Sequence, residues 1–178
     1  MTKNAVDGPW FPNFSPDGTR IAFPDGTNSY VFRPSGSLGE GTLEPLPPPA
    51  GGGWMQVYGW SPDARMLVGQ RQGGSDRNLL LYSFETKRFD DLGPASSGEV
   101  SVVGTLGALP VFLRDGKRIL YLDEKRRFAI FDLVARRSRP VGGAEGLHIT
   151  DFALTKDNRS IYVIDDHLES DIWLATLR

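Results

Sequence analysis

The sequence contains no cysteine, which excludes disulfide bonds, thiolate nucleophiles and cysteine-ligated zinc sites. Long apolar runs are also missing. No stretch approaches the roughly 20 apolar residues of a membrane-spanning helix, and the first eight residues lack the apolar core of a signal peptide. We therefore expect neither a membrane span nor a signal peptide in this chain. The compartment is left open between periplasm and cytoplasm.

An excess of positive charge is absent too. The net charge is −2, so the chain lacks the basic footprint typical of nucleic-acid binding. Two short arginine runs, at 126–127 and 136–139, have no stacking aromatic residue interleaved among them. Glycine (21) and proline (13) are abundant instead, while apolar residues make up a modest 39%. That composition predicts an all-β protein with many short turns and no nucleic-acid partner.

One turn sequence recurs along the chain. Phe14–Gly18 is repeated almost letter for letter at Trp60–Ala64, and Phe112–Gly116 and Leu154–Asn158 are weaker copies. The aspartates of successive copies are 46, 52 and 42 residues apart. A repeat of roughly 40–50 residues is typical of a β-propeller with one four-stranded antiparallel blade per repeat. The sequence therefore predicts four propeller repeats.

Each copy is expected to form a tight β-hairpin. In the first two copies proline presets the first central turn position, and in every copy aspartate follows and the third position takes a left-handed conformation. Gly18, Gly116 and Asn158 are residue types that tolerate a positive φ, whereas Ala64 is the exception and should cost about 1 kcal/mol there.

The strands follow from the turns. Large apolar residues stand three positions before and four positions after each turn aspartate, and we expect them to pack blade against blade. The residues before the turns are Phe14, Trp60, Phe112 and Leu154, and those after are Ile21, Leu67, Ile119 and Ile161. A third strand is predicted at Tyr30–Phe32, Leu81–Phe84, Ile130–Leu133 and Leu174–Leu177. A fourth, outer strand is predicted at Gly41–Leu46, Arg88–Leu92 and Arg137–Val141, with none after the last unit.

These elements predict a single propeller unit over residues 1–178. The predicted parts are an orphan outer strand at 2–8 and blades at about 9–47, 54–93, 100–142 and 147–178. Three assemblies remain open: a closed four-bladed monomer, a homodimer completing an eight-bladed ring, and a part of a larger propeller. We favour the last two, because bulky inner residues crowd a narrow four-bladed channel and open blade faces would be large apolar patches.

Three segments carry a resemblance to a known repeat. Pro12–Phe23 and Tyr58–Asp63 resemble the WD-like propeller repeat of the TolB type, and Ser170–Leu174 is similar to the last blade of many bacterial propellers of this group. The resemblance extends over nearly the whole chain and implies the fold. It also implies several roles: a partner in the periplasmic Tol–Pal system, a sensor domain on a kinase or transcription regulator, or a gating domain on a serine peptidase.

Residues for catalysis are sparse. His167 and Ser170 lie near Asp165, Asp166 and Asp171, but no Gly-x-Ser-x-Gly elbow is present to expose a nucleophile. Adjacent carboxylates elsewhere point to opposite faces of a strand and do not form a two-carboxylate site. No spacing matches a calcium loop or a zinc site. We predict no catalytic residue, no metal and no cofactor.

A binding face is the more plausible interpretation. In a propeller, the loops that connect blades share one face with the loops between second and third strands. Here that face would be acidic, and aromatic residues near the starts of inner strands could anchor a partner. The candidate binding residues are Trp10, Trp54, Tyr58, His148, Asp165, Asp166 and His167.

The sequence thus predicts a non-catalytic, TolB-like module that binds a protein or peptide partner. It would be the sensory part or a fragment of a larger bacterial protein. The alternatives are a substrate-gating propeller of a serine peptidase without its catalytic domain and an engineered or purely structural unit of propeller assembly.

Overall fold

The computed structural model describes residues 11–36, 40–74, 76–94, 100–101, 104–105, 109–142, 146–147, 149–165 and 171–176. Among these residues every regular element is a β-strand and every paired strand is antiparallel. None of them forms a helix long and apolar enough to span a membrane. The contacts within the chain divide it into two compact units, Met1–Gly93 and Pro94–Arg178.

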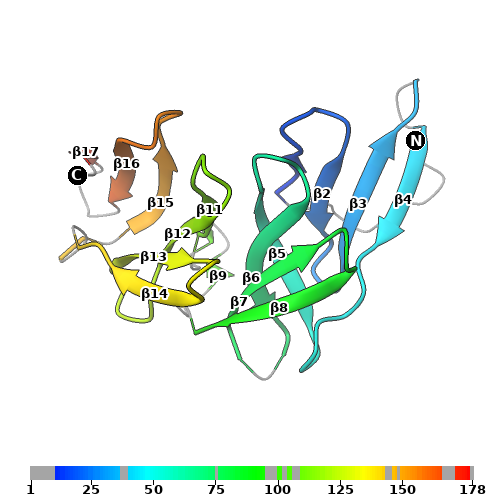
Figure 1. Cartoon of the computed structure of the whole chain (residues 1–178), viewed down its shortest axis with the longest axis horizontal. Helices are drawn as coiled ribbons and strands as arrows, with labels where there is room; N and C mark the ends of the chain where they lie inside the picture. The colour runs from blue at the N-terminus through cyan, green and yellow to red at the C-terminus, as the bar shows by residue number, and fades with distance from the viewer. Residues whose placement is uncertain are drawn as a thin grey trace. The chain divides into compact units, whose positions relative to one another are not determined.

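The first unit contains two four-stranded sheets in simple sequential order (Figure 1). The first sheet consists of β1 (Asn13–Phe14), β2 (Ile21–Pro24), β3 (Ser29–Pro34) and β4 (Gly41–Pro45). The second consists of β5 (Trp54–Trp60), β6 (Met66–Gln72), β7 (Leu79–Ser83) and β8 (Arg88–Gly93). Each sheet is the up-and-down arrangement of a propeller blade.

The second unit contains three sheets among its described residues. A short pair is formed by β9 (Val100–Ser101) and β10 (Gly104–Thr105). A four-stranded sheet consists of β11 (Val111–Phe112), β12 (Arg118–Leu122), β13 (Phe128–Asp132) and β14 (Arg137–Pro140). A three-stranded sheet consists of β15 (Ile149–Leu154), β16 (Ser160–Asp165) and β17 (Asp171–Thr176). The described part of the last sheet ends at its third strand, as the repeat pattern predicts.

The hairpin turns have the predicted geometry. Gly18, Ala64, Gly116 and Asn158 all have a positive φ, between 58° and 70°. In the first copy the Gly18 amide donates to the carbonyl oxygen of Ser15 at 2.8 Å, and the Ser15 amide donates to that of Arg20 at 2.8 Å. The same two bonds recur in the other three copies. The repeat is therefore a repeat of backbone geometry as well as of sequence.

Ala64 occupies its left-handed position for a reason that the turn sequence alone does not contain. Its side chain is only 5% exposed and packs in the core between the first two sheets. Burial of a methyl group contributes about 0.8 kcal/mol, which offsets most of the roughly 1 kcal/mol cost of the conformation.

A hydroxyl group supports the turn aspartate in three copies. Ser15, Ser61 and Thr155 donate to the aspartate two residues later at 2.5–2.6 Å. The hydroxyl of Ser15 also accepts the amide of Arg20 at 2.9 Å. In the first copy the Ser15 hydroxyl, and after it the backbone amide and hydroxyl of Thr19, donate to Asp17 and lower its pKa to about 2.

The two faces of each sheet have distinct roles. We define two rows of paired residues in each sheet. The rear row is the residue three positions before the turn aspartate together with the residues that pair with it across the strands. The front row is the adjacent set of paired residues, which begins one position earlier on the first strand. The rear row of the second sheet is Trp60–Leu67–Tyr82–Phe89, and the front row of the first is Asn13–Ala22–Val31–Glu44. Trp60, Leu67 and Tyr82 share one core cluster with Ala22 and Val31. Rear rows therefore pack on the front rows of preceding sheets.

Polar contacts reinforce the packing between the first two sheets. The guanidinium group of Arg20 stacks 4.6 Å from the ring centre of Trp60 and 4.7 Å from that of Phe84. The indole nitrogen of Trp60 donates to the carbonyl oxygen of Asn13 at 2.9 Å. The Ser29 hydroxyl donates to the carbonyl oxygen of Met55 at 2.6 Å. The two sheets of the first unit thus form one rigidly connected pair.

The second unit repeats this arrangement. The front row of the β11–β14 sheet contains Leu120 and Ile130, and these residues share a core cluster with Ile161 and Leu154 from the rear row of the last sheet. Phe128 and Phe152 add an edge-to-face contact with ring centres 5.1 Å apart.

The prediction that all four leading aromatic or apolar residues are core residues is wrong for Phe14. Trp60 and Phe112 are each 7% exposed, whereas Phe14 is 66% exposed. Phe14 heads the rear row of the first sheet, and Asn13 beside it turns to the opposite face, where its amide donates to the Val57 carbonyl oxygen at 3.2 Å. The second sheet therefore covers the front face of the first sheet and leaves its rear row open.

The predicted single unit over 1–178 and the blade boundaries remain predictions, and the predicted outer strand at 2–8 lies outside the described residues.

Substituting Gly18 with alanine should lower the free energy of unfolding by about 1 kcal/mol, because φ is +70° and nothing else lies within 4 Å of the added methyl group. Gly59→Ala is the matched control, since its methyl group also meets open space but its φ lies outside the left-handed region. Urea unfolding of both variants measures the difference. Equal effects would contradict the turn assignment.

Removing the hydroxyl in Ser15→Ala should raise the pKa of Asp17 from about 2 toward its usual value. A carboxyl with a lowered folded-state pKa stabilises the fold above its unfolded value, near 3.9, and this contribution is lost as the pH falls through the folded value. The variant should therefore be less stable than the unsubstituted chain at neutral pH, and this difference should shrink as the pH falls from about 4 toward 2, because the unsubstituted chain loses the larger carboxylate contribution. Carboxyl NMR measures the pKa, with Asp115, whose turn has no such hydroxyl, as an internal control.

Candidate functional site

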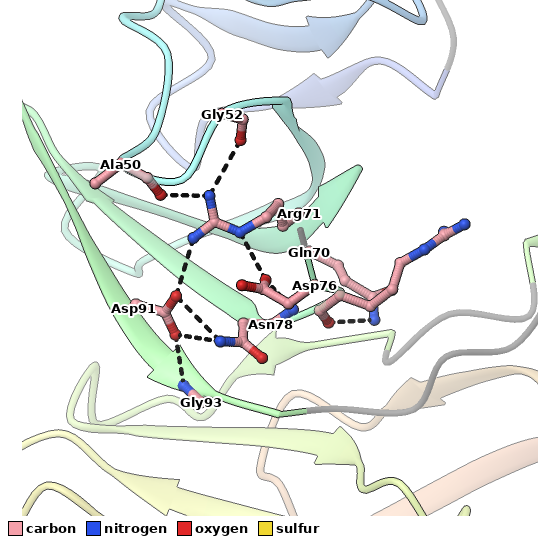
Figure 2. Close-up of polar contacts among 9 residues, drawn as sticks. Ala50, Gly52, Gln70, Arg71, Asp76, Asn78, Asp91 and Gly93 are labelled. Carbon is pink, nitrogen blue, oxygen red and sulfur yellow. Dashed lines mark hydrogen bonds and ion pairs between the residues drawn. The ribbon is translucent and has the colours of Figure 1, made fainter. Parts of the chain in front are cut away.

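The loops at one end of the second sheet are held together by a buried arginine. Arg71, near the end of β6, has a side chain only 3% exposed. Its Nε atom pairs with a carboxylate oxygen of Asp76 at 2.7 Å, and its Nη2 atom pairs with Asp91 at 2.9 Å. Its Nη1 atom donates to the carbonyl oxygens of Ala50 at 2.6 Å and Gly52 at 3.1 Å. Every nitrogen of the guanidinium group is thus engaged (Figure 2).

Further hydrogen bonds extend this cluster. The Asn78 side-chain amide donates to both carboxylate oxygens of Asp91, at 2.9 and 3.1 Å, and the Gly93 amide donates to Asp91 at 2.9 Å. The Asn78 backbone amide donates to Asp76 at 3.1 Å. We call this set the Arg71 brace, and its members are Ala50, Gly52, Arg71, Asp76, Asn78, Asp91 and Gly93.

The Arg71 brace joins segments that are distant in the sequence. Ala50 and Gly52 belong to the connection between the first two sheets, Asp76 and Asn78 to the β6–β7 loop, and Asp91 and Gly93 to the end of β8. The structure therefore brings together, in the first unit, the two loop types that the propeller pattern predicts on one face. A buried guanidinium group in which every nitrogen is hydrogen-bonded fixes these loops in one arrangement.

Glycines make this close approach feasible. A Cβ atom on Gly74 would lie 2.6 Å from Cδ of Arg71, and one on Gly53 would lie 2.1 Å from the carbonyl oxygen of Gln72. Gly53 also has a φ of +74°. Gly53 and Gly74 are thus required by close packing beside the Arg71 brace, whereas Gly51, Gly52 and Gly73 are favoured by positive φ values of 91°, 80° and 67°.

Trp54 stands at this end of the second sheet, at the start of β5, and is half-buried. A Cβ atom on Gly73 would lie 3.7 Å from its Nε1 atom, so the indole ring lies against the β6–β7 loop. Tyr58 lies on the same strand, at the register shift between Val57 and Gly59. The structure therefore places two of the predicted binding residues on one strand, with Trp54 directly beside the braced loops.

Asp165 lies elsewhere, at the end of β16 in the second unit, and is only 3% exposed. The other predicted binding residues, Trp10, His148, Asp166 and His167, lie outside the described residues. Whether the seven residues form one site therefore stays a prediction.

The carboxylates of the expected acidic face are largely used within their own loops. Asp76 pairs with Arg71, and Asp123 pairs with Arg127 at 2.7 Å. Asp25 accepts hydrogen bonds from Thr27 and Asn28 at 2.7–2.8 Å. Burial opposes the charged forms of Asp25 and Asp123, but these hydrogen bonds and, for Asp123, the Arg127 side chain bring the pKa of each below its usual value. These groups stabilise loops, which lowers their availability to a cationic partner.

Three buried glutamines, which the sequence analysis missed, lie on the sheet face opposite Arg71. Gln70 donates to the carbonyl oxygen of Arg77 at 2.9 Å, and Gln72 accepts from the Arg77 guanidinium group. Gln56 stands opposite Gln70 in register, and its Nε2 atom has no hydrogen-bond partner within the described structure. The only sequence signal for this cluster is the run Gln70–Gln72, which continues a buried apolar strand without interruption.

The described residues contain no group of three or more histidine, aspartate or glutamate side chains arranged to hold a metal ion.

Comparison with known proteins identifies the fold of the chain through solved structures. No family model and no curated protein matches the sequence. Among solved structures, a TolB protein from Acinetobacter baumannii matches with a TM-score of 0.68 and 14% identity, over 94% of this chain and 40% of that one. A protein described as a TolB from Agrobacterium tumefaciens matches with a TM-score of 0.72 and 15% identity, over 97% of this chain and 59% of that one. The chain thus has the TolB-like propeller fold and spans about half the length of these structures.

Enzymes are also among the similar structures. An oligogalacturonate lyase in complex with manganese matches with a TM-score of 0.64 and 18% identity, over 96% of this chain and 49% of that one. The tricorn protease matches with a TM-score of 0.52 and 11% identity, over 98% of this chain and 26% of that one. At these identities the likeness concerns the fold alone, because one fold carries many functions.

Replacing Arg71 with lysine should lower the free energy of unfolding by about 2 kcal/mol, because an ammonium group cannot reproduce the fork of bonds and leaves buried carbonyl oxygens unpaired. Arg33→Lys is the control, since its pair with Glu44 is exposed at 3.5 Å and worth about 0.5 kcal/mol or less. Urea unfolding measures both, and hydrogen exchange at Gly93 and Asn78 should accelerate only in the Arg71 variant.

Replacing Gln56 with methionine should leave stability unchanged or raise it by about 1 kcal/mol, because the change removes a buried donor that has no acceptor. Gln70→Met is the matched control across the strand pair and should destabilise, since it removes the bond to Arg77. Thermal unfolding of the two variants compares them directly. A large loss of stability in Gln56→Met would show that this amide has an essential partner.

Proposed function

We propose that the chain is a non-catalytic recognition module that binds a protein or peptide through the loops around the Arg71 brace. The observation that supports this proposal most is the brace itself. A fully bonded, buried arginine fixes three loop segments at the sheet end where the half-buried Trp54 lies. Loops that are ordered before binding lose less conformational entropy when a partner docks, so rigidity of this kind favours affinity.

Trp54 would serve as the anchor of this surface. Indole side chains combine a large apolar area with one hydrogen-bond donor and are enriched among the residues that dominate binding energy. The surrounding loops offer backbone groups at Pro47–Gly53 and side chains in the β6–β7 loop. This combination of one aromatic residue with exposed polar loops suits a peptide segment better than a small apolar ligand.

TolB proteins share the fold, which makes a role in protein recognition a reasonable extension. We place the module as the sensory part or a fragment of a larger bacterial protein. The alternative is a substrate-gating propeller of a serine peptidase, and the fold likeness to the tricorn protease is what favours it.

Selection of a random-peptide phage library on the immobilised chain tests the proposal. Selected peptides should bind Trp54→Ala at least tenfold more weakly than the unsubstituted chain, because the variant loses the aromatic anchor. They should also bind Arg71→Lys more weakly, since its loops are no longer fixed. Val134→Ala, a 77% exposed position on a different loop, is the control. Peptides that bind all variants equally, or a failure to select any, would contradict the proposal.

A fluorophosphonate probe separates recognition from catalysis. The chain should not be labelled, because a recognition module has no activated serine. Labelling that a single serine substitution abolishes would overturn the non-catalytic assignment and favour an enzyme.

A further inference from the structure

Among the described residues, two sheet faces carry large apolar side chains that are exposed or only partly buried. One is the rear row of the first sheet, Phe14–Ile21–Phe32–Leu43, in which every residue is apolar and none is fully buried. The other is the front face of the last sheet, where Tyr162 and Ile164 on β16 are 47% and 48% exposed. Phe14 is 66% exposed. Contiguous apolar surface of this kind on a β-sheet normally marks an interface.

The repeat reveals what each face is shaped to contact. Phe14 is the counterpart of Trp60, because each stands three residues before its turn aspartate. The row led by Trp60 is buried on Ala22 and Val31 in the front row of the preceding sheet. By the same count, Tyr162 is the counterpart of Ala22, five residues after the turn aspartate. Among the described residues, therefore, no front row packs on the open rear row and no rear row packs on the open front face.

The second unit confirms that this contact is a general rule of the repeat. The rear row of the last sheet, with Leu154 and Ile161, packs on Leu120 of the preceding sheet. The same geometry thus recurs at two places in the chain with different side chains. At the two open faces, each half of this contact is present without the other in the part of the chain that the structure describes.

We propose that a second copy of this chain covers these faces, with the rear row of the first sheet in each copy packing on the front face of the last sheet in the other. A second copy is favoured because it presents both complementary faces at once. An interface between two different patches either closes into a ring or continues as a fibre. Two-fold closure makes the same contact twice and gains affinity because the second contact forms within one complex.

Site-specific cross-linking tests this pairing. Because the chain has no native cysteine, only the introduced cysteines can be cross-linked by a thiol-reactive reagent. One variant carries Phe14→Cys and another carries Tyr162→Cys. A mixture of the two, treated with a short bis-maleimide, should give a covalent dimer. Phe14→Cys mixed with Val134→Cys controls for random collision, since Val134 is 77% exposed on the turn between β13 and β14 and belongs to neither row.

The double variant Phe14→Cys/Tyr162→Cys distinguishes the alternatives. If it cross-links within one chain while the mixture of single variants does not, the faces close on each other in a monomer and the proposal is wrong. If neither sample cross-links above the control, the faces do not meet and the proposal is also wrong.

Light scattering provides the second measurement. The chain should have about twice its 19.6 kDa mass in solution. Phe14→Glu should weaken self-association by tenfold or more, because it places a charge in an apolar contact, and Tyr162→Glu should do the same from the other side. Val134→Glu should leave the mass unchanged. Circular dichroism checks that each variant is folded. A monomeric unsubstituted chain, or association that survives both substitutions, would overturn the proposal.

Discussion

The packing of one sheet face on the next is the interaction on which this structure depends. A four-stranded sheet of about thirty residues has two faces and cannot bury either by itself, so each repeat is stable only through its neighbours. In the first unit the contact joins Trp60, Leu67 and Tyr82 to Ala22 and Val31. The hairpin turns serve this contact, because they set the register that places the large residues of adjacent strands in one row. The loops, in turn, are attached to sheets whose positions the contact has already fixed.

Polar groups at the sheet ends differ from those in the turns in where their hydrogen-bond partners come from. The turn aspartates are exposed and use local hydrogen bonds, each repeated because the turn is repeated. Arg71 belongs to no such pattern, and its partners come from three separate segments. The free energy of burying a guanidinium group is offset only because every nitrogen finds an acceptor. The Arg71 brace is therefore a non-repeated arrangement at one end of a repeated fold. A function specific to this chain would be expected at such a place.

Much of the fold could be predicted from the sequence, because its signals are local. The recurring turn defined the register pairs, such as Phe14 with Ile21 and Trp60 with Leu67, and the structure contains them. The length of β6 could not be predicted in this way, because the strand continues through Gln70, Arg71 and Gln72, and buried polar residues carry no periodic signal. The exposure of Phe14 could not be predicted either, because a sequence does not say how many sheets will be present to cover it. Arg71 was missed for a related reason: its partners are brought near it only by the completed fold.

The left-handed position of the hairpin shows how one backbone conformation can be occupied in different ways. Where the position faces open space, glycine satisfies it, as at Gly18. At Ala64 the methyl group is part of the core. At Asn158 the side-chain oxygen accepts the backbone amide of Arg114, at 2.6 Å, from the neighbouring hairpin. Substitutions at these three positions should therefore differ in how much they disturb the structure. A change at the first alters only local strain, while a change at the second or third also disturbs the adjoining repeat, so the copies of one turn differ in their tolerance to substitution within a single molecule.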